Sequence, residues 1–185
     1  SLAAQPVAGK QIEPSAAQVD VVILNYRTAP LAVRAAASAR ADGADSITIV
    51  ENDSGDGSLE ALTRETRDFA RVIAMPRNGG FAYGNNAGAR AGDRPLILFM
   101  NADTRLENGA LEALAAAFLD DKVGAAAPAL FYPDGRPQAS AYRFITPWGL
   151  LCAHLGIEKL AVRFGLAGLS GNADLARNGD YSGPV

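Results

Sequence analysis

The sequence predicts an α/β fold with a mainly parallel sheet flanked by helices, and three observations support this. Short apolar segments alternate with longer segments of helical pattern. Polar residues, often with glycine, directly follow the apolar segments. The chain has 185 residues, of which 49% are hydrophobic and 20% charged, so it can bury a sizeable core and is not wholly disordered.

Five segments have the composition expected of buried strands. They are short and apolar, and polar or glycine-containing segments bound them. These segments span residues 19–24, 46–50, 71–74, 95–100 and 123–130.

The segments between these strands favour helices. We expect one from Thr28, as its N-cap, to near Gly43, and another over residues 59–68. A helix of small residues follows the turn Asn78-Gly79-Gly80 and extends to about Ala91. A further helix, capped by Asn108, carries Leu111, Leu114 and Phe118, and Pro133-Asp134-Gly135 predicts the turn of a hairpin.

Composition excludes several functions. The chain has 17 Lys and Arg against 20 Asp and Glu, a net charge of −3, which argues against nucleic-acid binding. Its one cysteine, Cys152, cannot form an internal disulfide, which favours a reducing, cytoplasmic setting. The longest uncharged run, residues 144–157, is too short to span a bilayer.

Polar segments directly follow three of the predicted strands, at residues 25–27, 51–58 and 101–104. In parallel α/β sheets, ligands bind beyond the carboxyl ends of the strands. We therefore expect Glu51 to lie beside Asn25 and Tyr26, on the same rim of the sheet as Asp103. Asp103 offers half of a divalent-cation site, in which phosphate oxygens and waters complete the shell, or alternatively it caps a turn.

The remaining polar residues of the second loop have different predicted roles. Glu51 stands at the tip of its strand, where a carboxylate can accept from a base N–H or a ribose hydroxyl. Asp56 and Ser58 fit a turn and a helix cap.

The glycine-rich segment 78–88 allows close backbone approach, and the helix start that follows attracts anions. Its spacing is not the dinucleotide-binding fingerprint. Phe81 is interpreted as a core residue rather than a stacking platform. His154, the one histidine, is assigned to packing in an apolar helical stretch over residues 147–167.

The order of these segments resembles family 2 glycosyltransferases, which have the GT-A fold, and particularly the bacterial rhamnosyltransferase-like members. The matching segments are VVILNY at residues 21–26, IVENDSGDGS at 49–58, NGGFAYGNNAG at 78–88 and LFMNADT at 98–104. Pro133-Asp134-Gly135 followed by Gln138 is similar to the family's hairpin.

The resemblance implies a division of the chain. Residues 1–18 form a flexible leader and residues 19–145 a nucleotide-sugar-binding GT-A core. Residues 146–185 contain a helical segment and the start of a truncated acceptor-side region. The implied activity is inverting transfer of a sugar from a nucleotide-diphosphate sugar to an acceptor hydroxyl, in cell-surface polysaccharide or glycan synthesis. A glycan or lipid-linked acceptor implies contact with the inner face of the membrane, and the shortened fold implies a homodimer.

The resemblance also implies roles for particular residues. Asn25 and Tyr26 lie near the nucleoside, and Glu51 matches an aspartate that contacts the base. Asn85 lies where the glycine-rich helix approaches the nucleotide. Asp103 matches the last carboxylate of an Asp-X-Asp motif that holds Mg²⁺ or Mn²⁺, whereas Asn101 replaces the first and removes one charge.

No residue matches the family's general base, an acid of the C-terminal half, which we expect beyond Val185. Two alternatives stand beside the transferase. One is a non-catalytic nucleotide- or sugar-binding module, which the missing base favours. The other is a sugar-phosphate nucleotidyltransferase, which is disfavoured because no glycine-rich basic loop follows the first strand.

Overall fold

The structure is a computed structural model, and it describes residues 15–138 and 140. The chain divides into two compact units, with the boundary between Ala127 and Pro128. Part of the predicted leader, the helical stretch 147–167 and His154 therefore lie outside the described residues. Among the residues that are described, no helix has the length and apolar character needed to cross a membrane.

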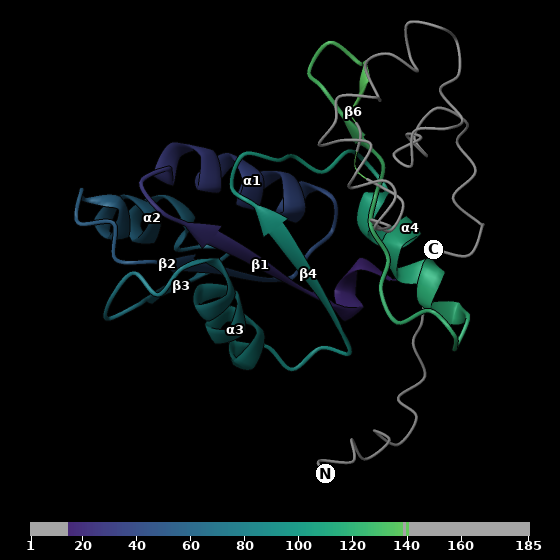
Figure 1. Cartoon of the computed structure of the whole chain (residues 1–185), viewed down its shortest axis with the longest axis horizontal. Helices are drawn as coiled ribbons and strands as arrows, with labels where there is room; N and C mark the ends of the chain where they lie inside the picture. The colour runs from purple at the N-terminus through teal and green to yellow at the C-terminus, as the bar shows by residue number, and fades with distance from the viewer. Residues whose placement is uncertain (1–14, 139, 141–185) are drawn as a thin grey trace, which may run out of the picture. The chain divides into compact units, whose positions relative to one another are not determined.

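A four-stranded parallel sheet forms the centre of the N-terminal unit (Figure 1). Its strands are β1 (Val19–Asn25), β2 (Ser46–Glu51), β3 (Arg71–Ala74) and β4 (Leu96–Asn101), in the order β3-β2-β1-β4. The chain thus builds outward from β1 to β3 and then returns to the other side of β1. The predicted parallel α/β architecture is confirmed, and the strand order reverses between β1 and β4.

Helices cover both faces of this sheet. The helices α1 (Ala29–Ala41) and α2 (Ser58–Thr66) pack against each other on one face, whereas α3 (Phe81–Ala91) covers β1 and β2 on the opposite face (Figure 1). Two short 3₁₀ turns, η1 (Ala16–Gln18) and η2 (Ala117–Leu119), precede β1 and follow α4 (Ala110–Ala116). Loops connect the ends of the strands to these helices.

Alternation along β1 builds a core on each face of the sheet. Val21 and Ile23 are fully buried in the cluster that contains the alanines of α1. The small alanine side chains let α1 lie close to the strands. On the other face, a Cβ at Gly88 would collide with the side chain of Val22. Part of the glycine-rich composition is therefore explained by close packing of α3 on the sheet.

The start of α4 corrects one prediction. Gly109, not Asn108, is the N-cap residue, and its φ of 82° suits glycine. The capping acceptor comes from elsewhere in the chain: the carboxylate of Asp42, just after α1, accepts from the backbone N–H of Leu111 at 2.8 Å and from that of Gly109. A local pattern could not reveal a cap supplied from 67 residues away.

Only the end of the predicted strand 123–130 forms one. Leu130–Phe131 is β5, which pairs antiparallel with β6 (Pro137–Gln138) in the second unit. Residues 123–129 contain alanines, Gly124 and Pro128, which favour strand formation poorly. The predicted hairpin is confirmed, and its turn carries Gly135 at a φ of 80°.

Candidate functional site

The carboxyl edge of the sheet brings the predicted polar residues together. Asn25 lies opposite Glu51 in the register of β1 and β2, and Leu24 lies opposite Asn101 in that of β1 and β4. Asp103 follows two residues after Asn101. The predicted common rim is therefore confirmed, and it includes the point between β1 and β4 where the strand order reverses. Ligands of open α/β sheets bind at such a point.

The loop after β1 is shaped by the side chain of Asn25, which is completely buried. Its Oδ1 accepts from the backbone N–H of Thr28 at 3.2 Å and from the Thr28 hydroxyl at 3.1 Å. The Thr28 hydroxyl therefore does not cap α1, although Thr28 is the N-cap residue as predicted. Between these anchors the ring of Tyr26 is 42% exposed, and the Arg27 guanidinium stacks on it at 5.2 Å from the ring centroid.

The loop after β2 holds its own acidic side chain inward. Glu51 is 5% exposed, and its carboxylate accepts from the backbone N–H of Asp53 at 3.1 Å and of Ser54 at 2.9 Å. The structure thus gives Glu51 a loop-organising role, and its contact with a nucleobase stays a prediction.

Further along this loop, the predicted turn at Asp56 and Ser58 is confirmed, whereas the N-cap residue of α2 is Gly57 and not one of these two. The Ser58 hydroxyl and backbone N–H both donate to the Asp56 carboxylate. The hydrogen bond from the Ser58 hydroxyl is the main cause that lowers the pKa of Asp56 below its usual value.

The loop between β3 and α3 is attached to the loop after β2. The Asn52 amide donates to Asn78 Oδ1 at 3.0 Å and accepts from the Gly79 N–H at 3.3 Å. Asn78 Oδ1 also accepts from the Gly80 N–H at 3.0 Å, just before α3 begins. Asn85 is buried in α3 and donates to the Phe81 carbonyl at 3.1 Å. The glycine-rich turn is therefore held at the same rim as Glu51.

Phe81 is not a core residue, contrary to the prediction, since it is 63% exposed. The path of α3 explains this. Gly84 approaches Leu24 near the end of β1, and Gly88 approaches Val22 further back along the strand. One turn before Gly84, at Phe81, the helix has passed the end of β1, so no strand remains to cover the ring. Exposure of Phe81 beside this rim makes it a candidate ligand contact that the local sequence pattern did not indicate.

The loop after β4 leaves the Asp103 carboxylate exposed. The turn is closed by the Asn101 carbonyl, which accepts from the Thr104 N–H at 3.2 Å and from the Thr104 hydroxyl at 2.7 Å. Within residues 15–138 and 140 the Asp103 side chain makes no hydrogen bond or ion pair. The turn-capping alternative for Asp103 therefore has no support here, and its carboxylate is available to a ligand.

The donor set at this loop fits only part of a metal site. Across the described ranges, no group of three or more His, Cys, Asp or Glu residues could hold a metal ion. Asp103 supplies one carboxylate, and Asn101 an exposed amide. Hard divalent cations retain waters and bind substrate phosphates. These residues therefore fit a cation shared with a bound diphosphate.

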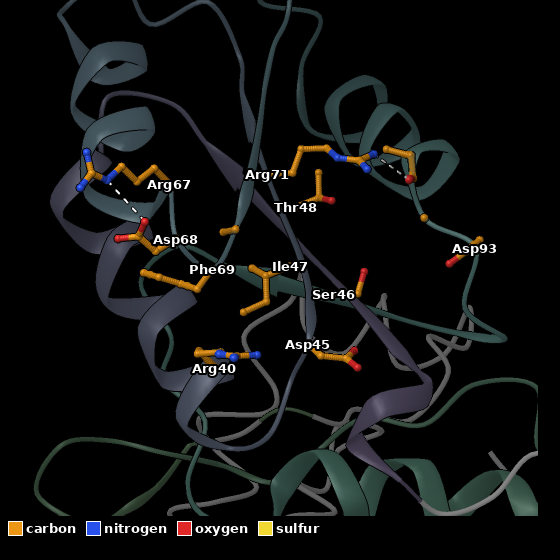
Figure 2. Close-up of a pocket in the computed structure, with 13 residues that line it drawn as sticks. Arg40, Asp45, Ser46, Ile47, Thr48, Arg67, Asp68, Phe69, Arg71 and Asp93 are labelled. Carbon is orange, nitrogen blue, oxygen red and sulfur yellow. Dashed lines mark hydrogen bonds and ion pairs between the residues drawn. The ribbon is translucent and has the colours of Figure 1, made fainter.

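The opposite edge of the sheet carries a hollow of about 600 Å³, lined by the amino ends of β2 and β3 and the C-terminal ends of α2 and α3 (Figure 2). Helix C-termini carry partial negative charge, and arginines here bind carbonyls. Arg71 donates to the carbonyl of Ala91, the last residue of α3, at 3.0 Å, and Arg40 donates to that of Ala44 at 3.2 Å. Arg40 and Arg71, two of the three arginines that line this hollow, therefore have a structural explanation.

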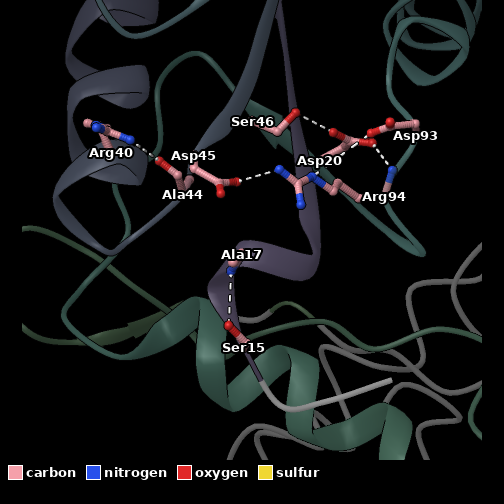
Figure 3. A network of polar contacts seen from close by, with 9 residues as sticks. All are labelled: Ser15, Ala17, Asp20, Arg40, Ala44, Asp45, Ser46, Asp93 and Arg94. Atoms are coloured by element: carbon pink, nitrogen blue, oxygen red, sulfur yellow. Dashed lines mark hydrogen bonds and ion pairs between the residues drawn. The ribbon is translucent and has the colours of Figure 1, made fainter. Parts of the chain in front are cut away.

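A polar network beside this hollow ties three strand starts together (Figure 3). The buried carboxylate of Asp20, in β1, accepts from the backbone N–H of Arg94 at 2.8 Å and from the Ser46 hydroxyl at the start of β2. The Arg94 guanidinium pairs with Asp45 at 3.2 Å. The amino edge thus stabilises the sheet, and the candidate site lies at the carboxyl edge.

Comparison with protein families matches residues 20–161 to glycosyl transferase family 2. The chain belongs to this family. The predicted membership is confirmed, and the match extends over most of the chain. A comparison with curated proteins finds no match to the chain.

Solved structures are similar to parts of this chain. The mannosyltransferase PcManGT from Pyrobaculum calidifontis, in complex with GDP-Man and Mn²⁺, is similar with a TM-score of 0.55 and 19% identity, over 62% of this chain and 36% of that one. TarS 1–349 from S. aureus has a TM-score of 0.48 and 20% identity, over 56% of this chain and 32% of that one. The likeness to PcManGT shows a GT-A-like fold, and this chain spans about a third of the length of that structure.

Proposed function

We propose that this chain is the nucleotide-sugar-binding part of a glycosyltransferase that transfers a sugar from a nucleotide-diphosphate sugar to an acceptor hydroxyl. Family membership supports the reaction class. The observation that carries the donor site is the row of Asn25, Glu51 and Asn101 across three neighbouring strands, next to the exposed carboxylate of Asp103.

Finer features belong to the same proposal. The transferase is bacterial, inverting and rhamnosyltransferase-like, and works in cell-surface glycan synthesis at the inner face of the membrane. Its acceptor is a glycan or a lipid-linked molecule, and residues 146–185 contain the start of the region that binds this acceptor. The order of the four matching segments supports these features.

Each part of the rim has a proposed task. The exposed rings of Tyr26 and Phe81 contact the flat faces of base or sugar. Asn25 and Glu51, which are buried and hydrogen-bonded, hold the loops that shape the pocket for the nucleoside, and Asn85 lies in α3 where the glycine-rich helix approaches the nucleotide. Asp103 and Asn101 hold Mg²⁺ or Mn²⁺ together with the diphosphate. When bound, the cation stabilises negative charge on the departing diphosphate.

We assign no general base among the described residues. Glu51 and Asp56, which lie on the rim, already accept hydrogen bonds from their own loop. A base must come within hydrogen-bond reach of the acceptor hydroxyl. We propose that it lies beyond Val185 in a longer chain, and this favours a nucleotide-binding module as the second candidate for the isolated 185 residues.

The proposal is tested by thermal unfolding with a panel of nucleotide-diphosphate sugars, with and without Mn²⁺. A ligand that binds only the folded state raises the Tm, by an amount set by its concentration relative to its Kd. We expect a rise with at least one donor that is larger when Mn²⁺ is present. Transfer to a lipid-linked acceptor by a longer chain distinguishes the transferase from the binding module. A panel without any shift contradicts both.

Replacing Phe81 with Ala is expected to weaken binding of that donor by about two- to tenfold, the range of an aromatic contact. Because the ring is exposed, the Tm without ligand should stay unchanged. Leu119→Ala is the matched control, since Leu119 is 61% exposed and lies after α4. Calorimetry measures both affinities. Equal affinity of Phe81→Ala and wild type would remove Phe81 from the site.

A further inference from the structure

Arg27 has a backbone conformation that its side chain disfavours. In the part of the chain that the structure describes, Arg27 and Asp53 are the two residues other than glycine with a positive φ, each at 58°. A Cβ makes this left-handed region unfavourable, and such residues persist where the surrounding structure holds them. The two residues lie in neighbouring loops at the candidate site, after β1 and after β2.

Ser54 is the residue that holds Arg27 in place. Its hydroxyl oxygen accepts from the Arg27 backbone N–H at 2.9 Å, and its carbonyl accepts from Arg27 Nε at 3.2 Å. The Asn25 amide donates to the same hydroxyl at 3.5 Å. Both ends of the Tyr26–Arg27 turn are therefore attached to one side chain of the other loop.

Ser54 is itself firmly positioned. Its backbone N–H donates to Glu51 Oε1 at 2.9 Å, and only 2% of the residue is exposed. The backbone joins the same loops nearby, where the Asn52 N–H donates to the Asn25 carbonyl at 3.0 Å. Ser54 thus fixes the loop after β1 relative to the end of β2. It is too deeply buried to serve as a ligand contact itself.

We infer that Ser54 is a positioning residue for nucleotide binding, which it promotes by fixing the stacked Tyr26–Arg27 pair at the rim. This inference rests on the proposed function, because the pair must meet a ligand. The exposed Tyr26 ring offers a face to a base, and the Arg27 guanidinium beside it offers positive charge to a diphosphate. A loop already held in the binding conformation loses less conformational entropy when the ligand binds.

The first measurement needs no ligand. Amide hydrogen exchange of Arg27 should become about tenfold faster or more in Ser54→Ala, since its N–H loses a buried acceptor. Ser58→Ala is the matched control, because the Ser58 hydroxyl is also buried but bonds to Asp56 within its own loop. Unchanged Arg27 exchange in Ser54→Ala would overturn the inference.

The second measurement is the affinity for UDP and GDP in the presence of Mn²⁺. Ser54→Ala should weaken the nucleotide that binds wild type by about three- to tenfold, and Ser58→Ala should not. Ser54→Thr, which keeps the hydroxyl, should have the nucleotide affinity of wild type, and its Arg27 amide should exchange as slowly as in wild type. This variant keeps the test valid even where Ser54→Ala also lowers the Tm.

A double-mutant cycle separates positioning from general loss of structure. The combined effect of Ser54→Ala and Tyr26→Ala should be smaller than the sum of the two single effects, because Ser54 acts partly through Tyr26, whereas the effects of Ser54→Ala and Asp103→Ala should add. Additive effects with Tyr26→Ala, or equal affinity of Ser54→Ala and wild type, contradict the Ser54 inference alone. Failure of the wild-type chain to bind any nucleotide instead contradicts the proposed function.

Discussion

Asp103→Ala is expected to weaken Mn²⁺-dependent nucleotide binding by about ten- to a hundredfold, while the affinity measured in EDTA stays as in wild type. This loss of affinity corresponds to removing one contact to a charged group, which contributes about 1.5–3 kcal/mol. Asp103 is the one acid of the loop after β4 that stands directly at the rim, and Asn101 brings no second charge. Calorimetric titration of the nucleotide, with Mn²⁺ and with EDTA, measures both affinities.

Asp93→Ala is the matched control for the loss of an exposed carboxylate, because Asp93 lies at the amino edge of the sheet. Asn101→Asp supplies the opposite change. A second carboxylate at the loop should strengthen Mn²⁺ binding, including in the absence of nucleotide. If Asp103→Ala keeps the affinity and metal dependence of wild type, the cation is not held at this loop.

Asp20→Ala is expected to lower the free energy of unfolding by about 2–4 kcal/mol, the largest effect on stability that we predict. The change removes a buried acceptor shared by the Arg94 N–H and the Ser46 hydroxyl, and leaves both donors without it. The starts of β1, β2 and β4 then lose their common anchor. Urea unfolding followed by circular dichroism measures the change.

Asp45→Ala tests whether burial is the reason. Asp45 meets the same Arg94, but through an exposed ion pair at 3.2 Å, so its loss should cost well under 1 kcal/mol. Asp20→Asn keeps the size of the side chain and one acceptor oxygen, so its free energy of unfolding should lie between those of wild type and Asp20→Ala. Equal stability of Asp20→Ala and Asp45→Ala would show that the buried network contributes little.

The sequence predicted the four parallel strands and the residues at their ends, because both depend on short-range patterns. β-branched apolar runs favour buried parallel strands, and the polar residues that end each run must come to the same edge of a parallel sheet. The sequence therefore predicts Asn25, Tyr26, Glu51 and Asp103 on one rim. The prediction of a strand over residues 123–130 was wrong because apolar character alone does not make a strand. Alanine, glycine and proline, which are frequent there, are unfavourable in strands.

Tertiary structure decided what each of these side chains does. The inward turn of Glu51, the cap that Asp42 supplies to α4 and the attachment of Arg27 to Ser54 all join residues that different loops or elements bring together. Whether Phe81 is buried depends on where α3 passes the end of β1, which no local pattern contains. Strand periodicity is a property of neighbours along the chain, so the sequence by itself determined the sheet and its rim. Burial and hydrogen bonding depend on residues brought together by folding, so only the structure separated the exposed Tyr26, Phe81 and Asp103 from the residues that hold the loops beneath them.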